Sequence, residues 1–127
     1  MLIARVWHGL TSEKLSDEYL HQLEKLRLTA YRRIPGNQGA LVFQRKTSGV
    51  AEFLVISVWE SYDAIRRFTS PKPLDTALYH EEEYRYLLFP EPKVSHYELA
   101  AGRAMLLTVR QTQEQTCEDQ STVEPAD

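Results

Sequence analysis

The stretch "LVISVWESYDAIRRF", residues 54–68, decides the fold. Its first half, together with the preceding Phe53, reads as a strand because apolar residues alternate along it. One face of the strand carries Phe53, Val55 and Trp59, and the other carries Leu54, Ile56 and Val58. Apolar side chains on both faces predict that this strand is covered on both sides.

The second half of the stretch predicts a helix. Ser61 is placed to cap its first amides, and Asp63 lies where a negative charge suits the positive helix end. Ala64, Ile65 and Phe68 then share one face, which we expect to turn inward. The stretch is therefore a strand that passes directly into an amphipathic helix.

A hairpin precedes this unit. The runs "ALVFQRK" (40–46) and "AEFLVISVW" (51–59) are rich in strand-forming residues and are separated only by "TSGV" (47–50). A short connection containing glycine between two such runs is typical of an antiparallel hairpin.

The flanking segments complete the pattern. We expect a first strand over 2–8, a helix over 17–34, one or two short helices over 74–88 and a last strand over 93–99. The apolar stripe of the 17–34 helix comprises Tyr19, Leu20, Leu23, Leu26, Ala30, Tyr31 and Ile34. The order βαββαβ predicts an α+β fold of the ferredoxin-like split βαβ type, with an antiparallel sheet and helices on one face.

Two helices cover only one face of such a sheet. Because the 51–59 strand is apolar on both faces, we predict a symmetric homodimer in which the open sheet faces pack together as a dimeric α+β barrel. The domain is expected to span 1–100. Residues 101–110 form a C-terminal extension, in which "AMLLTVRQ" (104–111) is either a dimer clasp or a loosely held segment.

Composition limits the classes of function. The 127 residues suit one domain, and no apolar run approaches the roughly 20 residues of a membrane span. No signal peptide is recognisable, and the single cysteine, Cys117, excludes an internal disulfide framework, so we expect a cytoplasmic protein. We read Cys117 as an inert exposed thiol.

The distribution of charge argues against nucleic acid as a partner. All 15 Lys and Arg lie at or before Arg110, where acids balance them, and no basic face is evident. Residues 111–127 contain five acids and no base, together with few large apolar groups. This composition predicts an acidic, disordered tail.

With this pattern assembled, residues 1–99 resemble the antibiotic biosynthesis monooxygenase family of dimeric α+β barrels. "LVISVWESYDAIRRF" carries most of the resemblance, supported by "RIPGNQGA" (33–40), "MLIARVWHG" (1–9) and "VSHYEL" (94–99). The resemblance implies oxygenation of small phenols or quinols, often without metal or flavin, in a pocket between helices and sheet. A phenolate can pass an electron to dioxygen itself, so the protein need only hold the ring, accept a proton and exclude water.

A related branch of this family degrades haem with an Asn, a Trp and a His. At the corresponding positions the present chain has Trp7 (or His8, if the register slips by one), Phe68 and a histidine near the family position, His80. One of the three residues is therefore retained.

His80 is the first candidate for a catalytic role. If 74–88 is helical, Ala77, His80, Tyr84 and Leu87 share one face, while the neighbouring glutamates are solvated. An inward imidazole there could accept a proton or hold an anion. The alternative is a histidine satisfied by a backbone carbonyl at the pocket rim.

Other candidates have two interpretations each. His8 ends the first strand and could reach a ligand, whereas His96, inside the last strand, is more typical of a structural histidine. Trp7 is either a pocket wall or a dimer contact, and Arg5 is either an interface ion-pair partner or an anion clamp. The remaining aromatic candidates, which either line a cleft for the substrate or form core, are Trp59, Tyr62, Phe68 and Tyr84.

No two histidines have the i,i+4 spacing of a helical metal site, so no metal is expected. The first hypothesis is a cofactor-independent monooxygenase that acts on a phenolic or quinol-type aromatic, with no membrane association. The second is a non-catalytic dimer of the same fold that binds a small molecule or serves as a stress or accessory module. Haem binding through His80 is a third.

Overall fold

The computed structural model describes residues 1–102. The predicted extension over 101–110, apart from its first two residues, and the predicted tail over 111–127 lie outside the described residues. The elements are β1 (Ile3–Ser12), η1 (Glu13–Leu15), α1 (Ser16–Leu23), η2 (Glu24–Leu28), α2 (Thr29–Tyr31), β2 (Asn37–Thr47), β3 (Val50–Trp59), α3 (Tyr62–Thr69), η3 (Glu81–Arg85), β4 (Leu87–Leu88) and β5 (Ser95–Glu98).

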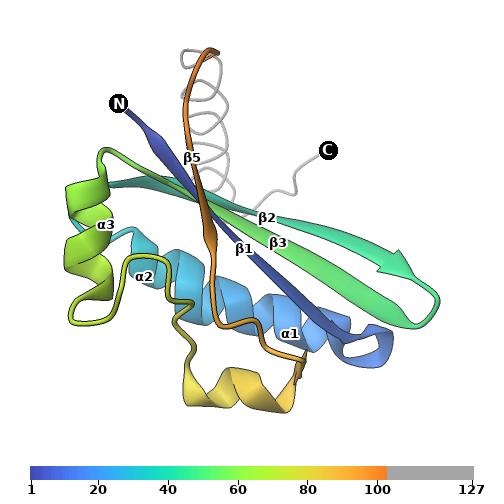
Figure 1. Ribbon diagram of the computed structural model, residues 1–127. Coiled ribbons are helices and arrows are strands. Elements are labelled where there is room, and N and C mark those ends of the chain that lie inside the picture. Colours follow the sequence, from blue (N-terminus) through green and yellow to red (C-terminus); the bar gives the residue numbers. More distant parts are fainter. Residues whose placement is uncertain (103–127) are drawn as a thin grey trace, which may run out of the picture.

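The strands form one antiparallel sheet in the order β2-β3-β1-β4, and β5 also pairs with β1. Figure 1 shows α1, α2 and α3 on the same side of this sheet. The predicted α+β, ferredoxin-like class is confirmed, and the sheet of one chain is open rather than closed. Strand β1 runs beyond the predicted end at His8, because residues 9–12 pair with 50–53 of β3.

The turn between β2 and β3 has the geometry that the hairpin requires. Ser48 and Gly49 both have positive φ, 52° and 84°. Two such residues at the centre of a two-residue loop match the right-handed twist of the flanking strands. The predicted hairpin is confirmed.

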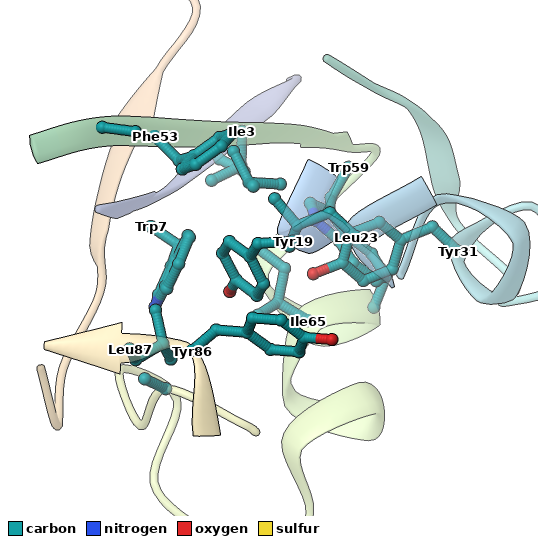
Figure 2. Close-up of a cluster of buried hydrophobic side chains, with 14 residues drawn as sticks. Ile3, Trp7, Tyr19, Leu23, Tyr31, Phe53, Trp59, Ile65, Tyr86 and Leu87 are labelled. Carbon is teal, nitrogen blue, oxygen red and sulfur yellow. The ribbon is translucent and has the colours of Figure 1, made fainter. Parts of the chain in front are cut away.

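The core lies between the sheet and the helices. Phe53, Val55 and Trp59 on β3 are almost fully buried, as are Tyr19 and Leu23 on α1. In Figure 2, Tyr19 lies among other aromatic rings, and its ring centroid is 5.3 Å from that of Phe53. Burying these large side chains supplies the main driving force for folding.

The first helix differs from its predicted stripe. Arg27 is buried and Ala30 is exposed, whereas the stripe placed Ala30 inward and left Arg27 out. The reason is the wide π turn η2 inside the helix, which alters the 3.6-residue rotation on which the stripe was based. Tyr19, Leu23, Arg27 and Tyr31, each four residues from the next, therefore all face the core.

The prediction for 74–88 is partly wrong. This segment contains a single 3₁₀ helix, η3, preceded by irregular chain. His80 stands before its first turn in extended backbone, and both His80 and Tyr84 are exposed. Residues three apart lie on one side of a 3₁₀ helix, and Glu83 and Tyr86 occupy the buried side. Glu83, which was expected in solvent, is therefore buried, and His80, which was expected to face inward, is exposed.

The other face of the sheet carries a partly buried apolar surface, which we call the open face. On β1 and β3 every second residue is buried against the helices, and the residues between them are of intermediate exposure. The apolar side chains of the open face are Ala4, Val6, Leu10, Leu41, Phe43, Leu54, Ile56, Val58 and Tyr97, assigned by strand register. Phe43 and Tyr97 are more than half exposed, so within residues 1–102 this face lacks a complete cover.

Within the described residues, no helix is long and apolar enough to cross a membrane. The same part of the chain has no group of three or more His, Cys, Asp or Glu residues that could hold a metal ion.

Candidate functional site

A small cavity of about 10 Å³ lies between the sheet and its helical cover, which is about the space that one water molecule needs. Its walls come from β1, β3, the first helix and α3, together with the segment between α3 and η3 that contains Leu78 and the segment before β5 that contains Val94. The lining side chains are Arg5, Trp7, Arg27, Tyr31, Val55, Ser57, Phe68, Leu78 and Val94. Three aromatic rings and two guanidinium groups therefore meet in one place.

Arg5 enters the cavity from the centre of β1. Its Nη1 donates to the carbonyl of Leu74 at 2.8 Å, and its Nη2 donates to that of Thr76 at 2.7 Å. Nη1 is also 3.0 Å from Nε2 of His96. Burial lowers the pKa of this guanidinium, which nevertheless stays protonated as arginine does in proteins. A charged group thus lies 4% exposed with peptide carbonyls and an imidazole as partners.

Arg27 enters the cavity from the opposite side, on η2. Its Nη2 and Nε donate to the two carboxylate oxygens of Glu83 at 2.8 and 3.3 Å. Tyr19 donates its hydroxyl to the same carboxylate at 2.9 Å. Burial lowers the pKa of Arg27, but Tyr31 and Glu83 raise it by more. This is a buried ion pair whose carboxylate also satisfies a tyrosine.

Trp7 forms the wall between these groups. The Arg27 guanidinium lies 4.4 Å from the ring centroid, within cation–π range. Trp7 donates its indole N–H to the Tyr79 hydroxyl at 2.9 Å. Gly9 is required beside it, because a Cβ there would come within 2.1 Å of the Trp7 ring. Both edges of the indole are therefore held in place.

His96 on β5 lies behind Arg5. Since every N–H of arginine is a donor, the Nε2 that faces Arg5 must be the acceptor, which makes this imidazole neutral with its proton on Nδ1. Burial, and then the charge of Arg5, lowers the pKa of His96. Within the described residues, His96 is the histidine whose ring hydrogen-bonds to a cavity-lining side chain.

Phe68, on the last turn of α3, plugs one side of the cavity. Its ring stacks on Trp59, with centroids 5.1 Å apart, and meets Tyr31 edge-on at 5.7 Å. Trp59 is fully buried and donates its indole N–H to Ser57 at 2.9 Å. Phe68 is only partly buried, as are the lining residues Leu78 and Val94. Phe68, Leu78 and Val94 are therefore the least buried part of the cavity lining, which we call the thin wall.

The structure brings some of the predicted site residues together and separates others. Trp7 and Phe68 line the cavity, so of its two interpretations Trp7 fits the pocket wall. Trp59 contacts Phe68 from the core side. Arg5 points to the helix side, so it cannot form an ion pair across the open face. Of its two interpretations, the anion clamp remains.

The remaining predicted residues lie elsewhere. Tyr62 donates its hydroxyl to Glu98 at the surface, and Tyr84 is 55% exposed. The ring of His80 is exposed; its backbone N–H donates to the Glu83 carboxylate at 3.1 Å, and its carbonyl accepts from the Glu83 N–H at 2.9 Å. His8 alternates with Trp7 on β1 and so lies on the open face. Roles for these four side chains stay predictions without support from the cavity.

The sequence reading did not single out Arg27 or Glu83, and it favoured a structural role for His96. Arg27 could have been found, because it falls four residues from both Leu23 and Tyr31 in the helical stripe. The position of Glu83 depends on the 3₁₀ geometry, for which "EEEYR" carries no clear signal.

His8 forms a charged cluster of its own on the open face. Its Nε2 is 2.7 Å from Glu52 and its Nδ1 is 2.9 Å from Glu91. Partial burial lowers the pKa of His8, but the hydrogen bonds to Glu91 and Glu52 outweigh this and raise it above the usual 6.5. Protonated His8 therefore stabilises the folded protein.

Replacing His8 by glutamine is expected to remove a pH-dependent part of the stability. Because the folded pKa is raised, the contribution is complete below about pH 6.5 and disappears as the pH rises through the raised value. Urea unfolding of both proteins at several pH values checks this, with the exposed His21→Gln as control. The gap between wild type and variant should close at alkaline pH, and a gap independent of pH would contradict the assignment.

Comparison with known proteins supports the fold. No protein-family model matches the sequence, and no curated protein matches it either. Among solved structures, one neighbour is a Bacillus cereus protein whose assignment as an antibiotic biosynthesis monooxygenase is provisional. It has a TM-score of 0.55 and 14% identity over 80% of this chain and 97% of that chain.

A second neighbour is Rv0793 from Mycobacterium tuberculosis, with a TM-score of 0.51 and 16% identity over 80% of this chain and 98% of that one. The haem degrader MhuD from the same organism, with two haems in its active site, has a TM-score of 0.49 and 14% identity over 79% of this chain and 97% of its own. This third likeness is too distant to bear on chemistry. At such identities the first two likenesses show the fold alone, which is the ferredoxin-like α+β arrangement described above.

Proposed function

We propose that this protein is a cofactor-independent monooxygenase for a small phenolic or quinol-type aromatic, bound in the cavity between helices and sheet. The observation that carries the proposal is the cavity itself, in which Trp7, Tyr31 and Phe68 meet the buried cation Arg5. Aromatic walls suit a flat ring, and a buried cation favours the phenolate over the phenol. The monooxygenase assignment of the Bacillus cereus neighbour is consistent with this chemistry.

The residues of the chain have separate tasks in this reaction. When the substrate binds, the Nη1–H of Arg5 turns from Nε2 of His96 to the phenol oxygen, so that Nε2 becomes free to accept the phenolic proton and Arg5 stabilises the resulting phenolate. The phenolate then gives an electron to dioxygen, which is the oxidant. One oxygen atom forms a new C–O bond on the ring, and the other leaves as water with the two hydrogens lost from the substrate, so that a phenol becomes a quinone.

Substrate entry requires the thin wall to move. The cavity holds about one water, whereas an aromatic ring needs several times that space. Phe68 is partly exposed at the end of α3, and rotation of its side chain away from Tyr31 enlarges the cavity toward solvent. The buried Trp59 stays in place as the floor.

Oxygen uptake with a panel of quinols and phenols tests this function. The intact protein should consume one dioxygen per substrate, and His96→Ala should lower the rate by about 100-fold or more, with loss of the acidic limb of the pH–rate profile. His80→Ala, at an exposed position, should retain the rate. If His80→Ala loses the activity and His96→Ala keeps it, His80 is the proton acceptor. No oxygen uptake by the intact protein would overturn the proposal.

A second function, non-catalytic binding of a small molecule, is favoured by how completely Phe68, Tyr31 and Trp59 fill the space. It predicts saturable binding of an aromatic compound without oxygen uptake. Comparison of binding and uptake on the same protein separates the two functions.

We also propose that the working form is a homodimer joined through the open face. The support is the apolar character of that face on β1, β2 and β3. Packing two copies there would leave the cavity of each subunit accessible on its helix side.

A further inference from the structure

The buried charges of this protein do not balance. Among residues 1–102 the buried charged side chains are Arg5, Arg27 and Glu83. Glu83 is committed to Arg27 by two hydrogen bonds. Asp75, near Arg5 along the cover, directs its carboxylate to Lys93 at 3.8 Å. Arg5 is therefore a buried cation without a carboxylate of its own.

The donors of Arg5 are also incompletely used. Of its five N–H groups, three face the Leu74 and Thr76 carbonyls and His96. The Nε–H and one Nη2–H have no acceptor within the described part of the chain. Arg27, which also lines this cavity, uses its own Nε and Nη2 to hold Glu83. The Arg27–Glu83 pair thus shows how these two nitrogens bind a carboxylate in this protein.

A purely structural role explains only part of this arrangement. The bonds from Arg5 to Leu74 and Thr76 fasten the segment that follows α3 onto the sheet. A neutral donor would hold these carbonyls without the cost of burying a charge. The unbalanced charge, the unused donors and the position on the wall of a cavity together point to an anionic ligand.

We infer that the ligand of this cavity is an aromatic carboxylate, whose carboxylate binds Arg5 while its ring lies among Trp7, Tyr31 and Phe68. This inference rests on the proposed function, because it takes the same cavity as the substrate site, and it narrows the substrate class to aromatic acids whose hydroxyl is ortho to the carboxylate, so that both groups lie beside Arg5. Carboxylate is favoured because its two oxygens match two parallel N–H donors. The Arg5 guanidinium already lies 5.6 Å from the centre of the Phe68 ring, so the charge and the ring wall adjoin.

Paired ligands that differ only in charge test the inference. Salicylate and salicylamide have nearly the same shape, and their binding without oxygen is measured by isothermal titration calorimetry. The acid should bind the wild type at least about tenfold more tightly than the amide. Equal affinities, or binding of neither compound, would overturn the inference.

Variants assign the preference to Arg5. Arg5→Met should abolish the preference for the acid, Arg5→Lys should keep part of it, and the exposed Arg66→Met should keep all of it. Circular dichroism confirms that each variant folds, and Arg5→Lys keeps the test valid should Arg5→Met unfold. A preference that survives in both Arg5 variants would contradict the inference. Excess sulfate, as a competitor without a ring, should displace the acid weakly, since strong displacement would indicate a general anion site.

The two proposals fail in different ways. Oxygen uptake with neutral quinols and no preference for acids would retain the monooxygenase and remove the carboxylate. A clear preference for the acid without any uptake would remove the oxygen chemistry and retain the anion site.

Discussion

Glu83→Gln is expected to lower the free energy of unfolding by about 3–5 kcal/mol, the usual consequence of removing one partner of a buried ion pair. The change preserves shape and the acceptor for Tyr19, but leaves Arg27 charged at 5% exposure without its carboxylate. Urea unfolding followed by circular dichroism measures the loss. The effect follows from the unpaired arginine rather than from lost packing.

Two further variants make this test specific. Glu82→Gln, at the exposed neighbouring position, should change stability by less than about 0.5 kcal/mol. Adding Arg27→Met to Glu83→Gln should restore much of the loss, because the stranded charge is then gone. A cost below about 1 kcal/mol for Glu83→Gln would mean that water reaches the pair.

Ile56→Lys is expected to convert a dimer into a monomer. Ile56 lies in the middle of the open face, paired with Val6 on β1 and Leu41 on β2. Burial of one isoleucine contributes about 1.5–3 kcal/mol, and a two-fold interface loses it twice, before the cost of placing two lysines there is added. The dissociation constant should therefore rise by at least about 100-fold.

Sedimentation at micromolar concentration measures this. The wild type should sediment at twice the 14.7 kDa chain mass and Ile56→Lys at the single-chain mass with an unchanged circular dichroism spectrum. Gln44→Lys provides the matched control, because Gln44 pairs with Phe53 and so points to the other side of the sheet at an exposed position. A wild type that sediments as one chain would remove the dimer proposal.

The fold was predictable because periodicity reports directly on burial. Alternation in 51–59 identified both faces of β3, and Ser61 marks the start of α3, where its hydroxyl accepts from the Ala64 amide at 3.1 Å. The site was less predictable, because its position depends on departures from regular geometry. The π turn rotates Ala30 away from the core, Arg27 is charged and so was not counted in the apolar stripe, and the 3₁₀ turn buries Glu83 and exposes His80. Neither turn has a sequence pattern as regular as that of a strand or an α-helix.

Strand β1 gives its odd-numbered residues, such as Arg5 and Trp7, to the cavity and its even-numbered residues, such as Val6 and His8, to the open face. A slip of one residue in its pairing would exchange the two sets, placing an imidazole in the core and an indole in solvent. The proposed ligand site and the proposed dimer face thus depend on a single strand alignment, so an insertion or deletion within these ten residues would disrupt both in one mutational step.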